Sequence, residues 1–217
     1  NIYFRVDASN LIGTGHVIRC LTLAELLKTK SASCVFICRE HEGNLISLIE
    51  SCGFQVERTP SKSLERVQSK HHSDFDLAHA EWLGSDWETD AEETKELIGE
   101  AKVDWLIVDH YALDCRWESA LKPHCSRLMV IDDLADRKHD CDILLDQNLV
   151  ANSDVRYDQL VPKHCIKLLG TEYALLQTQY AELHPRTPPR TGPVRRILIY
   201  FGGSDKTNIT GKAVSAF

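Results

Sequence analysis

The first place in the chain where chemistry could occur is a glycine turn that carries a histidine. The apolar run Ile2–Val6 is followed by a loop and by Gly13-Thr14-Gly15-His16, where an apolar spacing of three and four residues predicts a helix. Glycines let the backbone approach a ligand, and the N–H groups of a first helical turn favour anions. The helix macrodipole disfavours an imidazolium there, so we predict that His16 is a neutral catalytic base.

Arg19 lies one helical turn after His16, and the spacing places it on roughly the same side. We expect Arg19, together with Gly13, Thr14 and Gly15, to bind a negative group of the substrate. The alternative from spacing alone is a histidine that only caps the helix and an arginine at the surface.

Polar residues also follow three later apolar runs that are expected to be strands. Asp109-His110-Tyr111 follows 105–108, Asp132-Asp133 follows 128–131, and Asn148 follows 143–145. In a parallel sheet, ligands bind at the carboxyl ends of the strands. We predict that Asp109, His110, Tyr111 and Asp133 contact the substrate, while the other aspartate of the pair caps or turns. A turn with a capping aspartate is the alternative for the first group.

A second glycine turn lies near the end of the sequence. Gly202-Gly203-Ser204-Asp205, followed by Asn208, resembles the first turn, with backbone N–H groups and a hydroxyl suited to a diphosphate. We predict that these residues bind a nucleotide, although Asn208 as a simple helix cap is the alternative. Tyr173 precedes the expected domain junction and is predicted to contact the substrate.

The order of apolar runs predicts the elements that position these residues. We expect strands at 2–6, 33–38, 54–57, 105–108, 128–131 and 143–145, with helices at 15–28, 43–52, within 81–100 and at 114–122. Alternation of strands and helices predicts an α/β fold with a parallel, doubly wound sheet.

The chain is expected to contain two domains joined by a linker. Residues 184–194 hold four of the seven prolines and predict the linker between a first domain, 1–183, and the start of a second, 195–217. We expect a buried strand at 196–201 and a helix from about residue 208. The second domain is expected to be truncated at residue 217.

Composition excludes several classes of function. A net charge of −7 argues against nucleic-acid binding, and the sequence has no apolar run of the roughly 20 residues that span a bilayer. The eight cysteines are scattered, which predicts free, mostly buried thiols in the cytoplasm. The ten histidines show no zinc-ligand spacing, so no metal is expected.

The motifs, taken together and in order, resemble the PseG family of nucleotide-sugar hydrolases. The motifs that carry the resemblance are Arg5-Val-Asp-Ala, Ile12-Gly-Thr-Gly-His-Val-Ile-Arg-Cys-Leu-Thr-Leu-Ala24, Trp82-Leu-Gly, Asp90-Ala, Val108-Asp-His-Tyr111, Ile131-Asp-Asp-Leu-Ala135, Cys141-Asp-Ile-Leu-Leu145, Tyr173-Ala-Leu-Leu176 and Phe201-Gly-Gly-Ser-Asp-x-x-Asn208.

The resemblance implies a GT-B-like architecture of two Rossmann-like domains with the substrate between them. It implies hydrolysis of a UDP-linked 2,4-diacetamido-2,4,6-trideoxy sugar at the anomeric carbon, with inversion and release of UDP, in pseudaminic acid biosynthesis for a surface glycan or flagellin. His16 matches the family's catalytic histidine. No cofactor is expected, and the protein is expected to be a cytoplasmic monomer.

Two other functions are open at this point. A GT-B glycosyltransferase of the MurG kind also combines a glycine-rich first loop, a histidine and a UDP-sugar donor. The third candidate is a module that binds a sugar nucleotide without catalysis.

Overall fold

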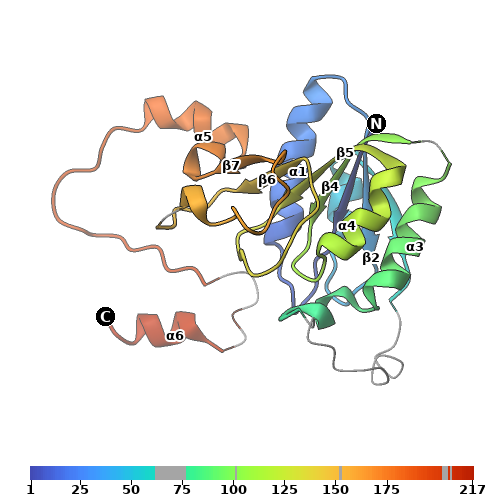
Figure 1. The fold of residues 1–217 in the computed structure, drawn as a ribbon. Coiled ribbons are helices and arrows are strands. Elements are labelled where there is room, and N and C mark those ends of the chain that lie inside the picture. The colour runs from blue at the N-terminus through green and yellow to red at the C-terminus, as the bar shows by residue number, and fades with distance from the viewer. Residues whose placement is uncertain (62–76, 101, 152, 202–204, 206) are drawn as a thin grey trace. The chain divides into compact units, whose positions relative to one another are not determined.

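The structure is a computed structural model that describes residues 1–61, 77–100, 102–151, 153–201, 205 and 207–217 (Figure 1). Its strands are β1 Ile2–Val6, β2 Cys34–Arg39, β3 Gln55–Thr59, β4 Val103–Asp109, β5 Cys125–Ile131, β6 Ile143–Asp146 and β7 Ile166–Leu169. Its α-helices are α1 Gly15–Thr29, α2 Ile46–Ser51, α3 Trp87–Ile98, α4 Cys115–Leu121, α5 Thr178–Leu183 and α6 Ile209–Val214. Short 3-10 helices are η2 Ala80–Leu83, η3 Lys122–His124, η4 Ser153–Val155, η5 Thr171–Tyr173 and η6 His184–Arg186.

The seven strands form one sheet in the order β3-β2-β1-β4-β5-β6-β7. Every neighbouring pair is parallel, and Val6 at the end of β1 pairs with Asp109 at the end of β4. The strand order reverses between β1 and β4, and this reversal is where open α/β sheets bind ligands. The fold is therefore α/β and Rossmann-like, as the sequence predicted.

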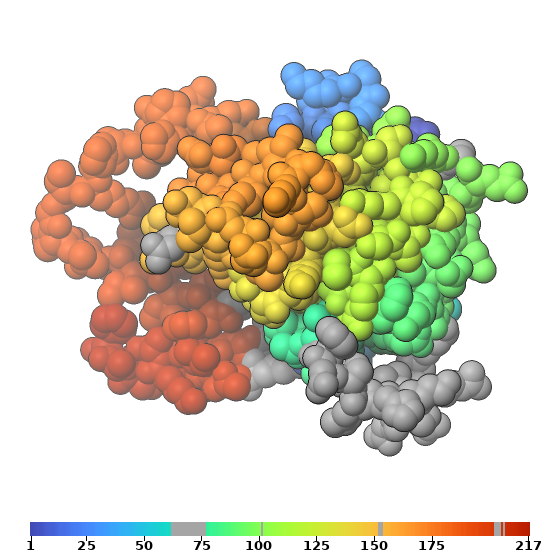
Figure 2. Space-filling model, in the orientation of Figure 1, coloured from blue at the N-terminus to red at the C-terminus, as the bar shows by residue number. Residues whose placement is uncertain are grey.

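Helices cover both faces of this sheet (Figure 1). Alternate strand residues explain the two layers, because successive side chains of a strand point to opposite faces. On one face, Phe4 and Val6 pack with residues of α1 and α2. On the other face, Leu106 and Val108 pack with residues of α3 and α4. The space-filling view shows the side on which residues of roughly the 110–170 region form the surface (Figure 2).

Aspartates begin two of the helices. The Asp86 carboxylate accepts a hydrogen bond from the Thr89 amide at 2.7 Å, and Asp114 accepts from the Arg116 amide at 2.9 Å. These bonds satisfy amide groups that have no partner within the helix. α1 differs, because Thr14 precedes it without a side-chain capping bond. The first turn of α1 therefore has no cap from the residue before it.

The described chain divides into two compact units, Asn1–Leu175 (unit 1) and Leu176–Phe217 (unit 2). Unit 1 contains all seven strands of the sheet. The predicted boundaries, with a linker at 184–194, stay a prediction, and α5 falls within unit 2.

The expectation of a buried strand at 196–201 is wrong. These residues form no strand, and Leu198 is 92% exposed. A strand needs a neighbour for its backbone hydrogen bonds and an apolar layer to pack on. No other strand lies within the described residues of unit 2, so the apolar run alone is not sufficient.

Other differences concern element ends and the sheet edge. The helix expected at 43–52 is shorter, at Ile46–Ser51, and the edge strand β7 was not predicted. Among the described residues, no helix is long and apolar enough to cross a membrane. All eight cysteines are free thiols, five of them buried, and the Cys141 and Cys165 sulfurs lie 3.6 Å apart.

Candidate active site

The site begins with a buried histidine–carboxylate pair. His16 lies in the first turn of α1, and Asp109 ends β4, so the two come from opposite sides of the strand reversal. Nδ1 of His16 lies 2.5 Å from Oδ1 of Asp109. His16 is 7% exposed and Asp109 is fully buried. The pair leaves Nε2 as the histidine nitrogen that can take up a proton, provided that Nδ1–H donates to the carboxylate.

Arg19 completes this arrangement from the next turn of α1. Its Nε and Nη2 donate to the two oxygens of Asp109, each at 2.6 Å, and Nη1 donates to Asp133 Oδ2 at 3.2 Å. Burial alone would raise the pKa of Asp109, but His16 and Arg19 hold it well below its usual range. Asp109 is therefore an anion that faces two cationic or potentially cationic groups. Both of its oxygens are engaged within the protein rather than facing a substrate.

Asp133 accepts hydrogen bonds from three side chains at the same edge of the sheet. Besides the bond from Arg19, it accepts hydrogen bonds from the Tyr111 hydroxyl and, at 3.1 Å, from Asn148 Nδ2. Its neighbour Asp132 accepts from the Ala135 amide at 3.0 Å. One aspartate of the pair therefore turns the chain, and the other reaches the site.

Aromatic rings adjoin the histidine–carboxylate pair. The phenol of Tyr111 meets the imidazole of His16 edge-on, with centroids 4.5 Å apart and an interplanar angle of 81°. The rings of His79 and Trp82 lie 5.6 Å and 5.7 Å from that of Tyr111. The sequence gives no signal for His79, and Trp82 stands out only as part of a motif. Both residues come from the segment around η2, before α3. Their spacing in the sequence does not indicate that they lie near Tyr111, because the fold brings them together.

The glycine turn is built by its own backbone and by Ser9. The Gly13 amide donates to the Ser9 carbonyl at 2.8 Å, and the Ser9 hydroxyl accepts from the Leu11 and Ile12 amides. Gly13 has φ +84°, a conformation that favours glycine. A Cβ placed on Gly13 or Gly15 would meet no described atom within 4 Å. The turn therefore has open space beside both glycines.

His110 does not join this group. Its Nδ1 accepts from the Ala112 amide at 3.1 Å, and its Nε2 lies 3.2 Å from Asp7 Oδ2. Burial lowers the pKa of His110, although Asp7 opposes the shift. His110 is 3% exposed, and both of its ring nitrogens face groups inside the protein, which does not match the predicted contact with a substrate.

The remaining predicted residues belong to η5, to unit 2 or to the part of the chain outside the described residues. Tyr173 is 38% exposed in η5, and the neighbouring carboxylate of Glu172 raises its pKa. Gly202, Gly203 and Ser204 lie outside the described residues. Asp205 accepts from the Ile209 and Thr210 amides, and Asn208 caps α6 by accepting from the Gly211 amide. Substrate contact by Tyr173 and nucleotide binding by the second glycine turn stay predictions.

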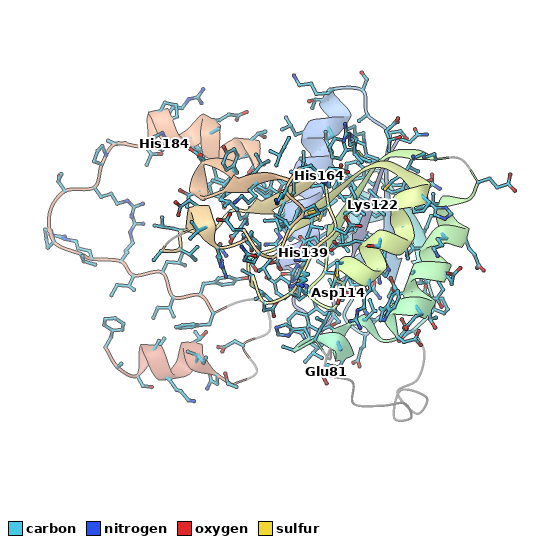
Figure 3. The ribbon with its side chains drawn as sticks, in the orientation of Figure 1. Glu81, Asp114, Lys122, His139, His164 and His184 are labelled. Atoms are coloured by element: carbon cyan, nitrogen blue, oxygen red, sulfur yellow. The ribbon has the colours of Figure 1, made fainter. Side chains whose placement is uncertain are left out.

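A second charged cluster lies on the α4 side of unit 1. His139, labelled in Figure 3, places Nδ1 2.7 Å from Glu118 Oε1 and Nε2 3.8 Å from Asp132 Oδ2. Burial alone would lower the pKa of His139, but Glu118 and Asp132 raise it to about 9. All three side chains are buried. Among the described residues, no group of three or more His, Cys, Asp or Glu side chains could hold a metal ion.

Comparisons with known proteins give two relatives. No protein-family model matches the chain. The UDP-2,4-diacetamido-2,4,6-trideoxy-beta-L-altropyranose hydrolase of Campylobacter jejuni is 28% identical over 209 residues, which cover 96% of this chain and 62% of that enzyme. The uncharacterized protein MJ1062 of Methanocaldococcus jannaschii is 22% identical over 214 residues, which cover 96% of this chain and 38% of that protein. The chain thus spans less than two thirds of either relative, and over nearly all of its own length it is similar to a UDP-sugar hydrolase.

Proposed function

We propose that this chain supplies the catalytic base of a hydrolase that cleaves a UDP-linked 2,4-diacetamido-2,4,6-trideoxy sugar at the anomeric carbon in pseudaminic acid biosynthesis. The observation that carries the proposal is the buried pair of His16 and Asp109 at the reversal of strand order. The similarity to the Campylobacter hydrolase supports the substrate class.

In the proposed mechanism, His16 takes a proton from water. Asp109 accepts a hydrogen bond from Nδ1–H, which places the proton acceptor at Nε2 and stabilises the imidazolium that forms when water is deprotonated. The water oxygen forms a bond to the anomeric carbon while the bond from that carbon to the UDP oxygen breaks. Attack opposite to the leaving group inverts the anomeric configuration.

UDP can leave without a strong general acid. The second pKa of a phosphoryl group is about 6, so the terminal phosphate of UDP is a weak base and carries the electron pair readily at neutral pH. The open space beside Gly13 and Gly15 and the uncapped first turn of α1 suit an anionic group. We assign the diphosphate to this turn as part of the proposal.

The test follows the water oxygen. The complete gene product is incubated with the UDP-sugar in ¹⁸O-water without an acceptor. Mass spectrometry measures the ¹⁸O content of each product, and NMR of the first-formed sugar reports its anomeric configuration. The proposal expects UDP release with ¹⁸O in the sugar and inverted configuration in the first-formed product. Label in UDP would mean attack at phosphorus, and release only on addition of an acceptor alcohol would identify a glycosyltransferase. Binding without turnover would leave only a sugar-nucleotide module.

A further inference from the structure

Five side chains of the site form a closed ring of contacts, which we call the His16 ring. His16 binds Asp109, Asp109 binds Arg19, and Arg19 binds Asp133. Asp133 accepts from the Tyr111 hydroxyl, and the Tyr111 side chain returns to the imidazole of His16 at a centroid distance of 4.5 Å. Arg19 Nη2 also lies 3.3 Å from His16 Nδ1, so each member contacts at least two others. His16 is held by Asp109 and Arg19 on one side and by Tyr111 on the other.

The His16 ring joins segments that are far apart in the sequence. His16 and Arg19 come from one face of α1, Asp109 ends β4, and Asp133 follows β5. The contacts span 93 residues from His16 to Asp109 and 114 residues from Arg19 to Asp133. The pairing of β1 with β4 and of β4 with β5 brings these segments to one edge of the sheet.

We propose that Tyr111 and Asp133 are positioning residues that hold the His16 imidazole in its reactive orientation, rather than ligands of the substrate. This inference rests on the proposed function, in which His16 is the base. Its first support is steric. The edge-on contact at 81° places the phenol group against the imidazole, so rotation of the imidazole about its Cβ–Cγ bond would strike Tyr111.

The second support is the division of charge around Arg19. Asp109 and Asp133 are two carboxylates that share one guanidinium, so the three groups together carry one negative charge. Arg19 donates Nε and Nη2 to Asp109 and Nη1 to Asp133, so the second carboxylate offsets part of the positive charge beside Asp109. Asp109 therefore retains attraction for the imidazolium that forms when His16 takes a proton from water.

Among the other groups that face the His16 ring, Arg137 has its charge paired with Asp132 and Asp136. Asn148 donates to Asp133, the Cys20 thiol lies 3.6 Å from Asp109 Oδ2, and the Arg137 guanidinium lies 5.8 Å from the centre of the Tyr111 phenol. His79 and Trp82 pack against the same phenol. Burial and the Asp133 carboxylate raise the pKa of Tyr111, so its hydroxyl is a donor at neutral pH.

The first test measures the His16 imidazole directly in this chain. Correlation of imidazole nitrogens with imidazole protons by NMR reports the tautomer, with the His16 signal assigned by its loss in His16→Gln. In the wild type we expect one tautomer with the proton on Nδ1. Tyr111→Leu removes the aromatic contact and Asp133→Asn removes the charge, and each is expected to mix the tautomers or broaden the signal. Tyr111→Phe keeps the aromatic contact and should show the smaller change.

Tyr157→Phe is the matched control. The Tyr157 hydroxyl binds Asp132 and Asp146, which are not members of the His16 ring, so the His16 signal should be unchanged. Unchanged His16 signals in folded Tyr111→Leu and Asp133→Asn would overturn the inference. Thermal unfolding of each variant shows that it is folded, and Tyr111→Phe covers the case in which a larger change unfolds the chain.

Kinetics of the complete gene product separate positioning from substrate binding. A positioning role predicts that kcat falls by roughly 10–100-fold in Tyr111→Leu with little change in KM. Asp133→Asn should also move the acid limb of the kcat/KM profile to lower pH, because a negative charge near the imidazolium is lost. A rise in KM with kcat unchanged would instead make these residues substrate ligands and refute the inference. Full activity of His16→Ala would contradict the proposed function. The NMR result on the orientation of the His16 imidazole would be unaffected.

Discussion

At the scale of the residue, the position of Asp109 is as predicted, but its contacts differ from the predicted contact with the substrate. The sequence puts Asp109 at the ligand edge of the sheet, and the structure confirms that position. The side chain is fully buried and binds His16 and Arg19, which makes it the partner of the proposed base. A sequence shows where a strand ends, but it does not show which side chain 93 residues away will meet it.

Replacement of Asp109 by asparagine should separate orientation from charge. The amide of Asp109→Asn has the size of the carboxylate but does not stabilise the imidazolium, so we expect kcat to fall by roughly 10²–10⁴-fold. The measurement is single-turnover UDP release by the complete gene product. Asp114→Asn is the control, because asparagine also caps helices and Asp114 caps α4 through Arg116, away from the His16 ring. Equal rates for Asp109→Asn and the wild type would contradict the assigned role.

His139 should make stability depend on pH. Its folded-state pKa, raised to about 9, exceeds the ordinary value of 6.5, so its stabilisation is complete below pH 6.5 and is lost as pH rises through 9. We expect the free energy of unfolding to fall by at most about 3 kcal/mol over this window. Urea unfolding of the wild type and His139→Gln at several pH values measures the effect. His164→Gln, at an exposed position, should keep the wild-type slope, and an unchanged slope in His139→Gln would refute the assignment.

At the scale of the element, periodicity predicted the alternation of strands and helices but not every boundary. Buried apolar strands such as β4 and β5 are clear because both faces are covered. β7 was missed because its residues are only partly buried at the edge of the sheet. The run 196–201 has the same apolar signal as a buried strand, and it forms none because no neighbouring strand is present among the described residues of unit 2.

The two glycines of the first turn should respond differently to alanine. Gly13 has φ +84°, so Gly13→Ala forces a left-handed backbone and should cost about 1–2 kcal/mol of stability. Gly15 lies in the first turn of α1 with open space beside it, so Gly15→Ala should keep or slightly raise stability. If a ligand uses that space, Gly15→Ala should nevertheless weaken turnover. Thermal unfolding and UDP release measure the two effects, and equal destabilisation by both variants would contradict the backbone argument.

At the scale of the whole molecule, unit 1 contains the sheet, both apolar cores and every member of the His16 ring. The sequence predicted that His16, Asp109, Tyr111 and Asp133 would lie at one edge, because parallel strands place their carboxyl ends together, but it also placed His110 in this group. It could not predict that the His110 imidazole contacts Asp7 while the Tyr111 hydroxyl donates to Asp133. That choice depends on which face of the sheet each side chain enters, and so on the register of the folded strands.

A chain of residues 1–175 should therefore fold by itself. We expect its Tm to lie within a few degrees of that of residues 1–217, because the contacts of both cores are retained. The His16 NMR signal should also be the same in both chains. A loss of cooperative unfolding in residues 1–175 would show that unit 2 contributes to the stability of the sheet.

In the proposed mechanism, His16, held by Asp109, is the base that activates water. The most direct measurement is the rate of UDP release from the UDP-sugar by the complete gene product without an acceptor, compared between the wild type and His16→Ala. We expect His16→Ala to lose roughly 10²–10⁴-fold in kcat while it still folds. Turnover by His16→Ala at the wild-type rate would contradict this mechanism.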